Sequence, residues 1–200
     1  MLITISGLSG SGKSSAAKGL SAKIGVPTVD IGQIFRRMAK EHGMDVVTFG
    51  PYAEKHPEID RKLDAAMIRK VKRAGDIILQ GRLAGHMTAR EGMEAVRIWI
   101  AASARTRASR VSRREGVPYR QALSEISQRD RDNRIRYKRT YGLDLNDLSV
   151  YDIVVQTDRL SIEEVVTCLV KALNRIWPKK RKMKSTKRKA SLPPKRPLRT

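Results

Sequence analysis

The sequence predicts an α/β fold built on a parallel five-stranded sheet with helices packed against it. Short apolar segments alternate along the chain with stretches of helical periodicity, and the connections are long enough for the crossovers that parallel strands require. A glycine-rich segment, GLSGSGKSS, separates the first of these strands from the first helix. With 200 residues, the chain is long enough for one sizeable domain with a buried core.

The first part of the pattern begins directly with a strand. Leu2–Ser6 (LITIS) predicts a buried strand, and Lys13–Ile24 carries small and apolar residues at helical spacing until Gly-Val-Pro ends the helix. Pro27–Asp30 predicts a second short strand, and Ile31–Glu41 predicts a second helix. A further helix is expected over Glu58–Arg73, where Ala-Gly follows it.

Two more strands follow this helix. Asp76–Gln80 (DIILQ) is apolar between its ends, as expected for a strand covered on both faces. Val96–Ala101 (VRIWIA) predicts the fourth strand. Two arginine-rich helices are then expected, over Arg105–Glu115 and Tyr119–Tyr141, with Gly-Val-Pro between them.

The C-terminal part supplies the fifth strand and one more helix. Ile153–Gln156 (IVVQ) predicts the strand. Ser161 is expected to cap the last helix, because SIEE places a glutamate three residues after the serine. This helix is expected to end near Ile176, and Cys168 is expected to be a small buried side chain within it.

The glycine-rich segment fits the pattern G-x-x-x-x-G-K-[ST] without departure. Glycines let backbone amides approach an anion closely, and a loop that opens a helix directs free amides and the helix dipole at a phosphate chain. Lys13 is expected to bridge the β- and γ-phosphates of ATP, and Ser14 to place its hydroxyl on Mg²⁺. The alternative is a turn that is rich in Gly and Ser by chance. The candidate nucleotide-binding residues are Gly7, Leu8, Ser9, Gly10, Ser11, Gly12, Lys13, Ser14 and Ser15.

The net charge of +22 is distributed unevenly. Lys179–Thr200 holds eleven Lys or Arg residues and no acid, while Ser103–Thr140 holds twelve against four acids. Residues 179–200 are nearly devoid of core-forming side chains and are expected to be a disordered basic tail. Such a tail favours contact with RNA or the ribosome, and the alternative is an extension that has no partner.

No apolar run is long enough to span a membrane and no signal peptide is visible, so a cytoplasmic protein is expected.

Several longer segments carry a resemblance to a known family. VDIGQIFRRMAKEHGM, PYAEKHPEIDRKLDAAMI, ILQGRLAGHM, REGVPYRQALSEISQRD and RYKRTYGLDLNDLSVYDIVVQT follow one another in the order and spacing of the archaeal-type cytidylate kinases, which the chain resembles from Leu2 to about Ile176. The resemblance implies a nucleoside monophosphate kinase domain over residues 1–178. Its P-loop core would carry a helical monophosphate-binding part (31–74) and a lid (104–141). Separately from the resemblance, a monomer is expected. The implied reaction is the ATP- and Mg²⁺-dependent phosphorylation of CMP, and of dCMP, by direct in-line transfer.

This resemblance also places candidate substrate residues. Arg36 is expected to hold the monophosphate, and Gly81 and Arg82 follow the third strand at the carboxyl edge of the sheet, where ligands bind in such folds. A guanidinium group suits bidentate phosphate contact. Asp30 opens the second helix and is expected to cap it, and relatives of this kind read the base or ribose near this position.

In the lid, one helix face carries the candidate catalytic cations. Arg129, Asn133 and Arg136 lie at i, i+4 and i+7, and the resemblance implies that this face approaches the substrates. Arg129 and Arg136 are expected to stabilise the charge of the transferring phosphoryl group, as Lys13 does. The other lid arginines that we considered are assigned to the surface: Arg105, Arg107, Arg113 and Arg120.

One departure from the family pattern concerns Gln80, where related proteins generally have a carboxylate. A glutamine cannot supply charge to Mg²⁺ or to its water shell.

Two other functions also stay open at this stage. One is a monophosphate kinase for another base, and the other is an RNA-associated P-loop ATPase or assembly factor that docks through its tail.

Overall fold

A computed structural model describes residues 1–190 of the chain, of which Val47 and residues 178–190 are described by their backbone only. The five predicted strands are confirmed and form one parallel sheet in the order β2-β3-β1-β4-β5. Both the second and the third strand begin one residue later than expected. The strands are β1 (Leu2–Ser6), β2 (Thr28–Asp30), β3 (Ile77–Gln80), β4 (Val96–Ala101) and β5 (Ile153–Gln156).

The helices follow the predicted order, with two additions. They are α1 (Lys13–Ile24), α2 (Ile31–Glu41), α3 (Val46–Lys55), α4 (Pro57–Arg73), α5 (Ala84–Arg90), α6 (Ala104–Glu115), α7 (Tyr119–Tyr141) and α8 (Ile162–Ala190). Helices α3 and α5 were not predicted, because α3 contains Gly50 and Pro51 and α5 is short and has a glycine in its first turn. Packing holds α3 in place, since Phe49 is fully buried among side chains of α2 and α4.

Helix α8 is longer than predicted. Its cap is confirmed, because the Ser161 Oγ accepts from the Glu164 amide at 3.2 Å and a Glu164 carboxylate oxygen accepts from the Ser161 amide at 2.8 Å. The expected end near Ile176 is wrong, since the helix runs to Ala190 and takes in the first part of the segment predicted to be disordered. Lys, Arg, Met and Ala favour helix, and this part of the segment has no glycine. The rest of the predicted tail, residues 191–200, lies outside the described residues.

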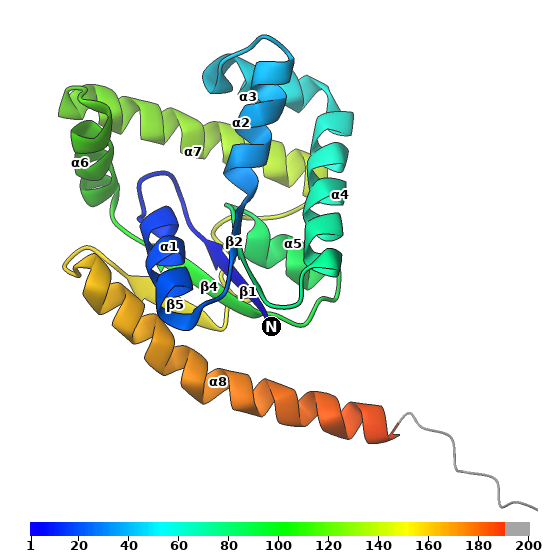
Figure 1. The fold of residues 1–200 in the computed structure, drawn as a ribbon. Helices are drawn as coiled ribbons and strands as arrows, with labels where there is room; N and C mark the ends of the chain where they lie inside the picture. Colours follow the sequence, from blue (N-terminus) through cyan, green and yellow to red (C-terminus); the bar gives the residue numbers. More distant parts are fainter. Residues whose placement is uncertain (191–200) are drawn as a thin grey trace, which may run out of the picture.

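Two apolar clusters hold the sheet between its helices. Alternate residues of a strand point to opposite faces, so Ile3 and Ile5 pack with α1 and α8, whereas Leu2 packs with Met67 of α4 and Met87 of α5. The result is a three-layer arrangement (Figure 1). The exposed Cys168 contradicts the expectation of a buried side chain, because it lies on the face of α8 that does not pack on the sheet.

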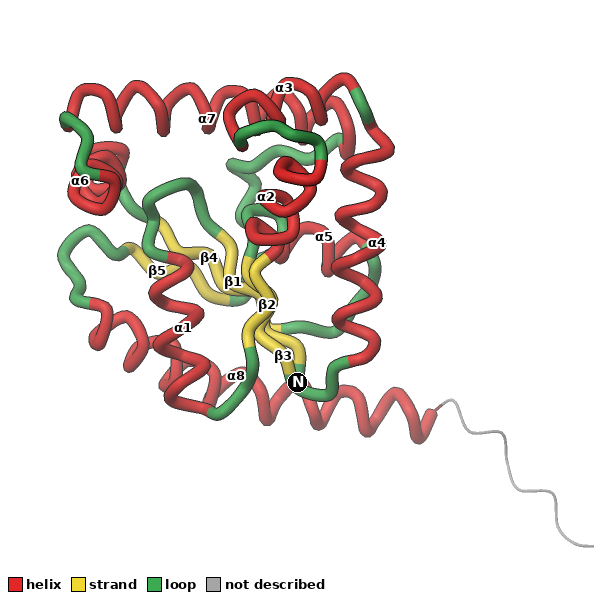
Figure 2. Tube along the Cα trace, turned by 45° about the horizontal axis from the view of Figure 1, so that its top comes forward, coloured by secondary structure: helices red, strands yellow, loops and turns green. Residues whose placement is uncertain are grey.

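Helix α7 crosses above the carboxyl edge of the sheet. Figures 1 and 2 both show it extending from α6 on one side to α3 and α4 on the other. Its first half packs on α6 through Ala108, Val111, Ala122 and Ile126. The helix therefore contacts both predicted insertions, and it lies over the loop that follows β1. Within the described part of the chain, no helix is both long and apolar enough to cross a membrane.

Candidate nucleotide-binding and phosphoryl-transfer site

The loop between β1 and α1 has the backbone of an anion-binding loop. Gly12 adopts a left-handed conformation (φ 95°) at the helix N-cap, and no side chain caps the amides of the first turn. Gly10 also has a positive φ of 77°, and a Cβ there would lie 2.7 Å from the Arg107 carbonyl oxygen. These amides are therefore open to a ligand anion, and Gly10 lets α6 pack directly on the loop.

A cavity of about 370 Å³ adjoins this loop. The loop lines one part of it with polar groups, and Ile100, Leu160, Ile162 and Val165 supply apolar side chains to the rest, where α6 adds Arg110 and Arg114. A phosphate chain suits the first part and a flat organic ring suits the second. Its lining comprises Gly10, Ser11, Gly12, Lys13, Ser14, Ser15, Ile100, Arg110, Arg114, Thr157, Leu160, Ile162 and Val165.

Lys13 lies among groups that weaken its charge. Its pKa is lowered to about 7, chiefly by burial and next by the nearby positive charge of Arg82, while Asp30 acts in the opposite direction. The ammonium group donates to the Leu8 carbonyl oxygen at 3.3 Å. A bound phosphate chain would supply the negative charge that stabilises the protonated form, so this lysine is suited to a polyphosphate ligand.

Ser14 opens toward solvent in the first turn of α1. The Gln80 Nε2 donates to its Oγ at 2.7 Å, and Gln80 is buried at the carboxyl end of β3. Among the described residues, no three His, Cys, Asp or Glu side chains gather in a way that could hold a metal ion. A hydroxyl without a carboxylate cage fits Mg²⁺ that arrives with a nucleotide and keeps most of its water ligands.

The predicted substrate residues at the ends of β2 and β3 lie beside this loop. The Arg82 guanidinium donates to the Ser9 Oγ. Gly81 at the end of β3 packs closely on α2, since a Cβ there would lie 2.9 Å from the Cδ1 and 3.0 Å from the Cβ of Ile31. Asp30 caps α2 as expected, because its Oδ1 accepts from the Gly32 amide at 2.8 Å. Its other oxygen pairs with Arg36 at 3.2 Å.

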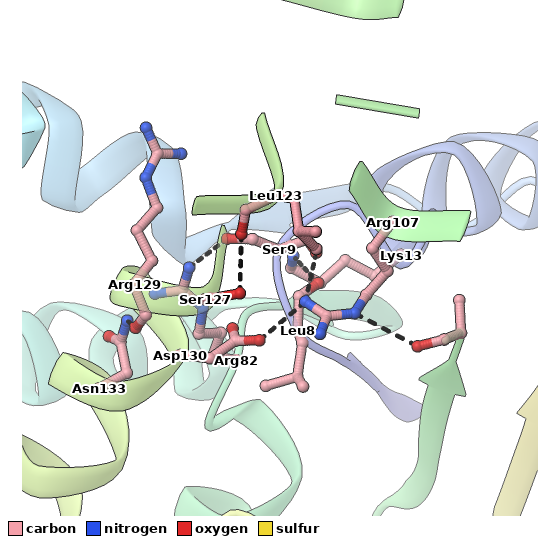
Figure 3. A network of polar contacts seen from close by, with 11 residues as sticks. Leu8, Ser9, Lys13, Arg82, Arg107, Leu123, Ser127, Arg129, Asp130 and Asn133 are labelled. Carbon is pink, nitrogen blue, oxygen red and sulfur yellow. Dashed lines mark hydrogen bonds and ion pairs between the residues drawn. The ribbon is translucent and has the colours of Figure 1, made fainter. Parts of the chain in front are cut away.

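The three predicted lid residues have other partners in the structure. Arg129 pairs with Glu125 of its own helix at 3.8 Å, and its guanidinium extends away from Lys13 (Figure 3). The Asn133 side chain donates to the Arg129 carbonyl oxygen. Neither contact reaches the phosphate-binding loop.

Arg136 is buried and joins α7 to α4 and α2. Its Nε donates to a carboxylate oxygen of Asp60 on α4 at 3.0 Å, and a second nitrogen pairs with the other oxygen. The guanidinium carbon lies 5.1 Å from the ring centre of Phe35 on α2. In this structure Arg136 therefore connects three helices, and its charge is compensated by Asp60.

Arg107 corrects the sequence analysis, which assigned it to the surface. It is only 6% exposed, because its side chain turns inward from α6. Its Nη1 donates to the Ser9 carbonyl oxygen at 3.1 Å and pairs with Asp130 at 2.8 Å, and its Nε donates to the Ala102 carbonyl oxygen at 3.2 Å (Figure 3). This ion pair links α6 and α7 to the loop.

Arg110 is a second cation that the sequence analysis did not single out. Its Nη1 donates to the Ser11 carbonyl oxygen at 2.9 Å and to the Thr157 Oγ1 at 3.0 Å, and its Nη2 donates to the Thr157 carbonyl oxygen at 2.6 Å. Arg107 and Arg110 lie three residues apart, on one face of α6. That spacing in a helix directly after a central strand is the signal that could have identified them.

Comparisons with known proteins agree with this architecture. The sequence profile of the cytidylate kinase-like family matches residues 2–159. The cytidylate kinase of Pyrococcus horikoshii is 42% identical over 178 residues, which cover 89% of this chain and 91% of that protein. The cytidylate kinase of Methanocaldococcus jannaschii is 38% identical over 177 residues, covering 88% and 99% of the two chains.

Solved structures show the same fold at much lower identity. A gluconokinase from Sinorhizobium meliloti superimposes with a TM-score of 0.58 at 15% identity and covers 87% of this chain and 91% of its own. A shikimate kinase from Bacteroides thetaiotaomicron gives a TM-score of 0.57 at 14% identity, covering 87% and 98%. The predicted α/β core of a P-loop kinase is therefore confirmed.

Proposed function

This chain belongs to the cytidylate kinase-like family, and from that premise we propose that it transfers the γ-phosphoryl group of ATP to CMP and to dCMP. The family makes the chain a nucleoside monophosphate kinase, with ATP as donor. One observation above all supports a small anionic acceptor, which is that cationic side chains gather beside the loop. Arg82 touches Ser9, and Arg36 is held next to Asp30 at the end of the neighbouring strand.

The donor would occupy the cavity beside α1. Its phosphates would lie on the amides of Gly10–Ser15, and its base would lie between Arg110 and the apolar side chains of Leu160 and Ile162. Mg²⁺, when bound with ATP, would be held by the Ser14 hydroxyl and would neutralise phosphate charge there. Lys13 would contact the β- and γ-phosphates and regain its full charge on doing so.

The acceptor would approach from the side of α2. Arg36 and Arg82 would bind its phosphate and orient one oxygen in line with the γ-phosphorus, so that the P–O bond to ADP breaks as the new bond forms. No general base is needed, because the attacking oxygen is already anionic. Arg129 is proposed to reach the transferring group by a change of rotamer, since its pairing with Glu125 is long and half-exposed. Arg136 and Asn133 would reach the substrates only if α7 moves relative to α4.

A coupled assay for diphosphate formation tests this proposal. The full chain is mixed with ATP and Mg²⁺ and with CMP, dCMP, UMP or AMP in turn. Preferred turnover of CMP and dCMP is the expected result, whereas faster turnover of UMP or AMP would assign another base. Arg82→Met is expected to raise the KM for CMP by about tenfold or more, since a charge-assisted phosphate contact is lost. Arg105→Met on the exposed side of α6 is the matched control.

A second activity, contact with RNA through the C-terminal part of α8, is supported by one observation. This helix continues to Ala190, away from the phosphate-binding loop (Figure 1), and residues 179–190 include eight Lys or Arg and no acid. Removing residues 179–200 is expected to abolish RNA binding and its steep salt dependence, while CMP turnover persists. RNA-stimulated ATP hydrolysis without turnover of any monophosphate would instead favour the assembly-factor alternative. We also propose a cytoplasmic monomer, and size-exclusion chromatography with light scattering would check the oligomeric state.

A further inference from the structure

The end of β3 places one buried polar side chain against the proposed metal ligand. Gln80 is 5% exposed and is the last residue of β3, where it pairs in register with Ile5 of β1 and Asp30 of β2. Its Nε2 lies 2.7 Å from the Ser14 Oγ. The hydroxyl oxygen accepts this hydrogen bond and keeps a second lone pair for a cation.

The contact orients Ser14 without adding charge. Gln80 is an amide, and Asp30, the carboxylate on the adjacent strand, is already engaged by the Gly32 amide and by Arg36. Lys13 and Arg82 add positive charge to the same region. A free divalent cation would therefore meet a neutral ligand in a positive field, whereas a cation carried by nucleotide phosphates would meet an oriented hydroxyl.

We propose that Gln80 is a positioning residue, which directs the Ser14 hydroxyl toward Mg²⁺ and makes metal binding depend on the nucleotide. This inference rests on the proposed function. Hydrogen-bonding partners of metal ligands change metal affinity by about 10–100-fold when they are removed. A neutral partner supplies this orientation but gives the empty site no affinity of its own for the ion. Metal and nucleotide are then taken up together.

The test is a thermodynamic coupling that does not use the acceptor. The Kd of ADP is measured by titration calorimetry with excess Mg²⁺ and with EDTA, and the ratio of the two constants reports how strongly metal and nucleotide bind together. Gln80→Leu is expected to lower this ratio by about tenfold and to leave the Kd in EDTA unchanged within about twofold. Gln80→Glu is expected to raise the ratio and to produce Mg²⁺ binding without nucleotide. Gln121→Leu, which removes an exposed amide paired with Glu125 on α7, is the matched control.

Two results would overturn the proposal. One is a wild-type ratio in Gln80→Leu, and the other is an equal loss of ADP affinity with and without Mg²⁺, which would mark Gln80 as part of the fold alone. If Gln80→Leu does not fold by circular dichroism, the nearly isosteric Gln80→Glu decides, because an unchanged ratio in that variant contradicts the proposed role. Absence of CMP turnover in the wild type would refute the proposed function but would leave this measurement intact.

Discussion

Replacement of Arg107 by methionine tests whether the buried ion pair of α6 and α7 holds the phosphate-binding loop. The change keeps the aliphatic part of the side chain and removes the guanidinium group. It thereby deletes the bonds to the Ser9 and Ala102 carbonyl oxygens and the ion pair with Asp130. The side chains of Arg107 and Asp130 are only 7% and 12% exposed, so solvent screens this pair weakly.

The size of the effect follows from what remains behind. Asp130 becomes an uncompensated buried carboxylate, and its Oδ1 already has no hydrogen-bond partner among the described residues. Removal of one partner from such a pair costs about 3–5 kcal/mol, out of a typical total of about 5–15 kcal/mol. For a chain of this size, this corresponds to a fall in Tm of about 6–20 °C. The double variant Arg107→Met/Asp130→Leu is expected to be less destabilised than the single variant, because the charge is removed with its partner.

Urea denaturation followed by circular dichroism gives the free energy of unfolding of each variant, and calorimetry gives the Kd of ADP. Arg107→Met is expected to weaken ADP binding in addition, since the Ser9 carbonyl is no longer fixed. Arg105→Met, an exposed change on the same helix, is the control. Two results would refute a stabilising role for this ion pair. One is a free energy of unfolding for Arg107→Met that is no lower than that of Arg105→Met. The other is a double variant whose free energy of unfolding lies below that of Arg107→Met.

Three further predictions concern the same region and its support. The pKa of Lys13 is lowered to about 7, chiefly by burial, and bound phosphates favour its charged form. ADP binding at about pH 8 is therefore expected to take up about one proton, and the affinity for ADP is expected to fall as pH rises above 7. Calorimetry in two buffers measures the proton uptake, which Lys13→Met should abolish. Burial raises the pKa of Asp64 from 3.8 to about 6, so the contribution of this residue to stability falls as pH rises between these values. Asp64→Asn is therefore expected to raise the Tm at pH 7.5 and to leave it nearly unchanged at pH 4, which thermal melts measure. Gly10→Ala is expected to cost about 1–3 kcal/mol and to weaken ADP binding, because its Cβ would meet the Arg107 backbone at positive φ. Gly92→Ala, which also has positive φ but no atom within 4 Å, is its control, and equal losses of ADP affinity in both would contradict the steric argument.

Local signals were sufficient for the sheet and for most helices. The five strands are short apolar segments, and most of the helices show clear periodicity or caps, such as Ser161 at the start of α8. The errors occurred where local preference and tertiary packing differ. Helix α3 forms despite an internal proline because Phe49 is buried, and Cys168 lies in an apolar helix but on its exposed side.

The sequence by itself determined the phosphate-binding loop and the order of the elements around it, because these depend on contiguous residues and on the alternation of strands and helices. Only the tertiary structure decided which of the many arginines are buried and what each of them holds. Arg107 meets Asp130 through the packing of α6 on α7, and Arg136 meets Asp60, which is 76 residues away in the chain. A helical arginine has the same local pattern whether it faces water, a carbonyl oxygen or a carboxylate. The difference arises from the desolvation and charge that partners distant in sequence impose on it.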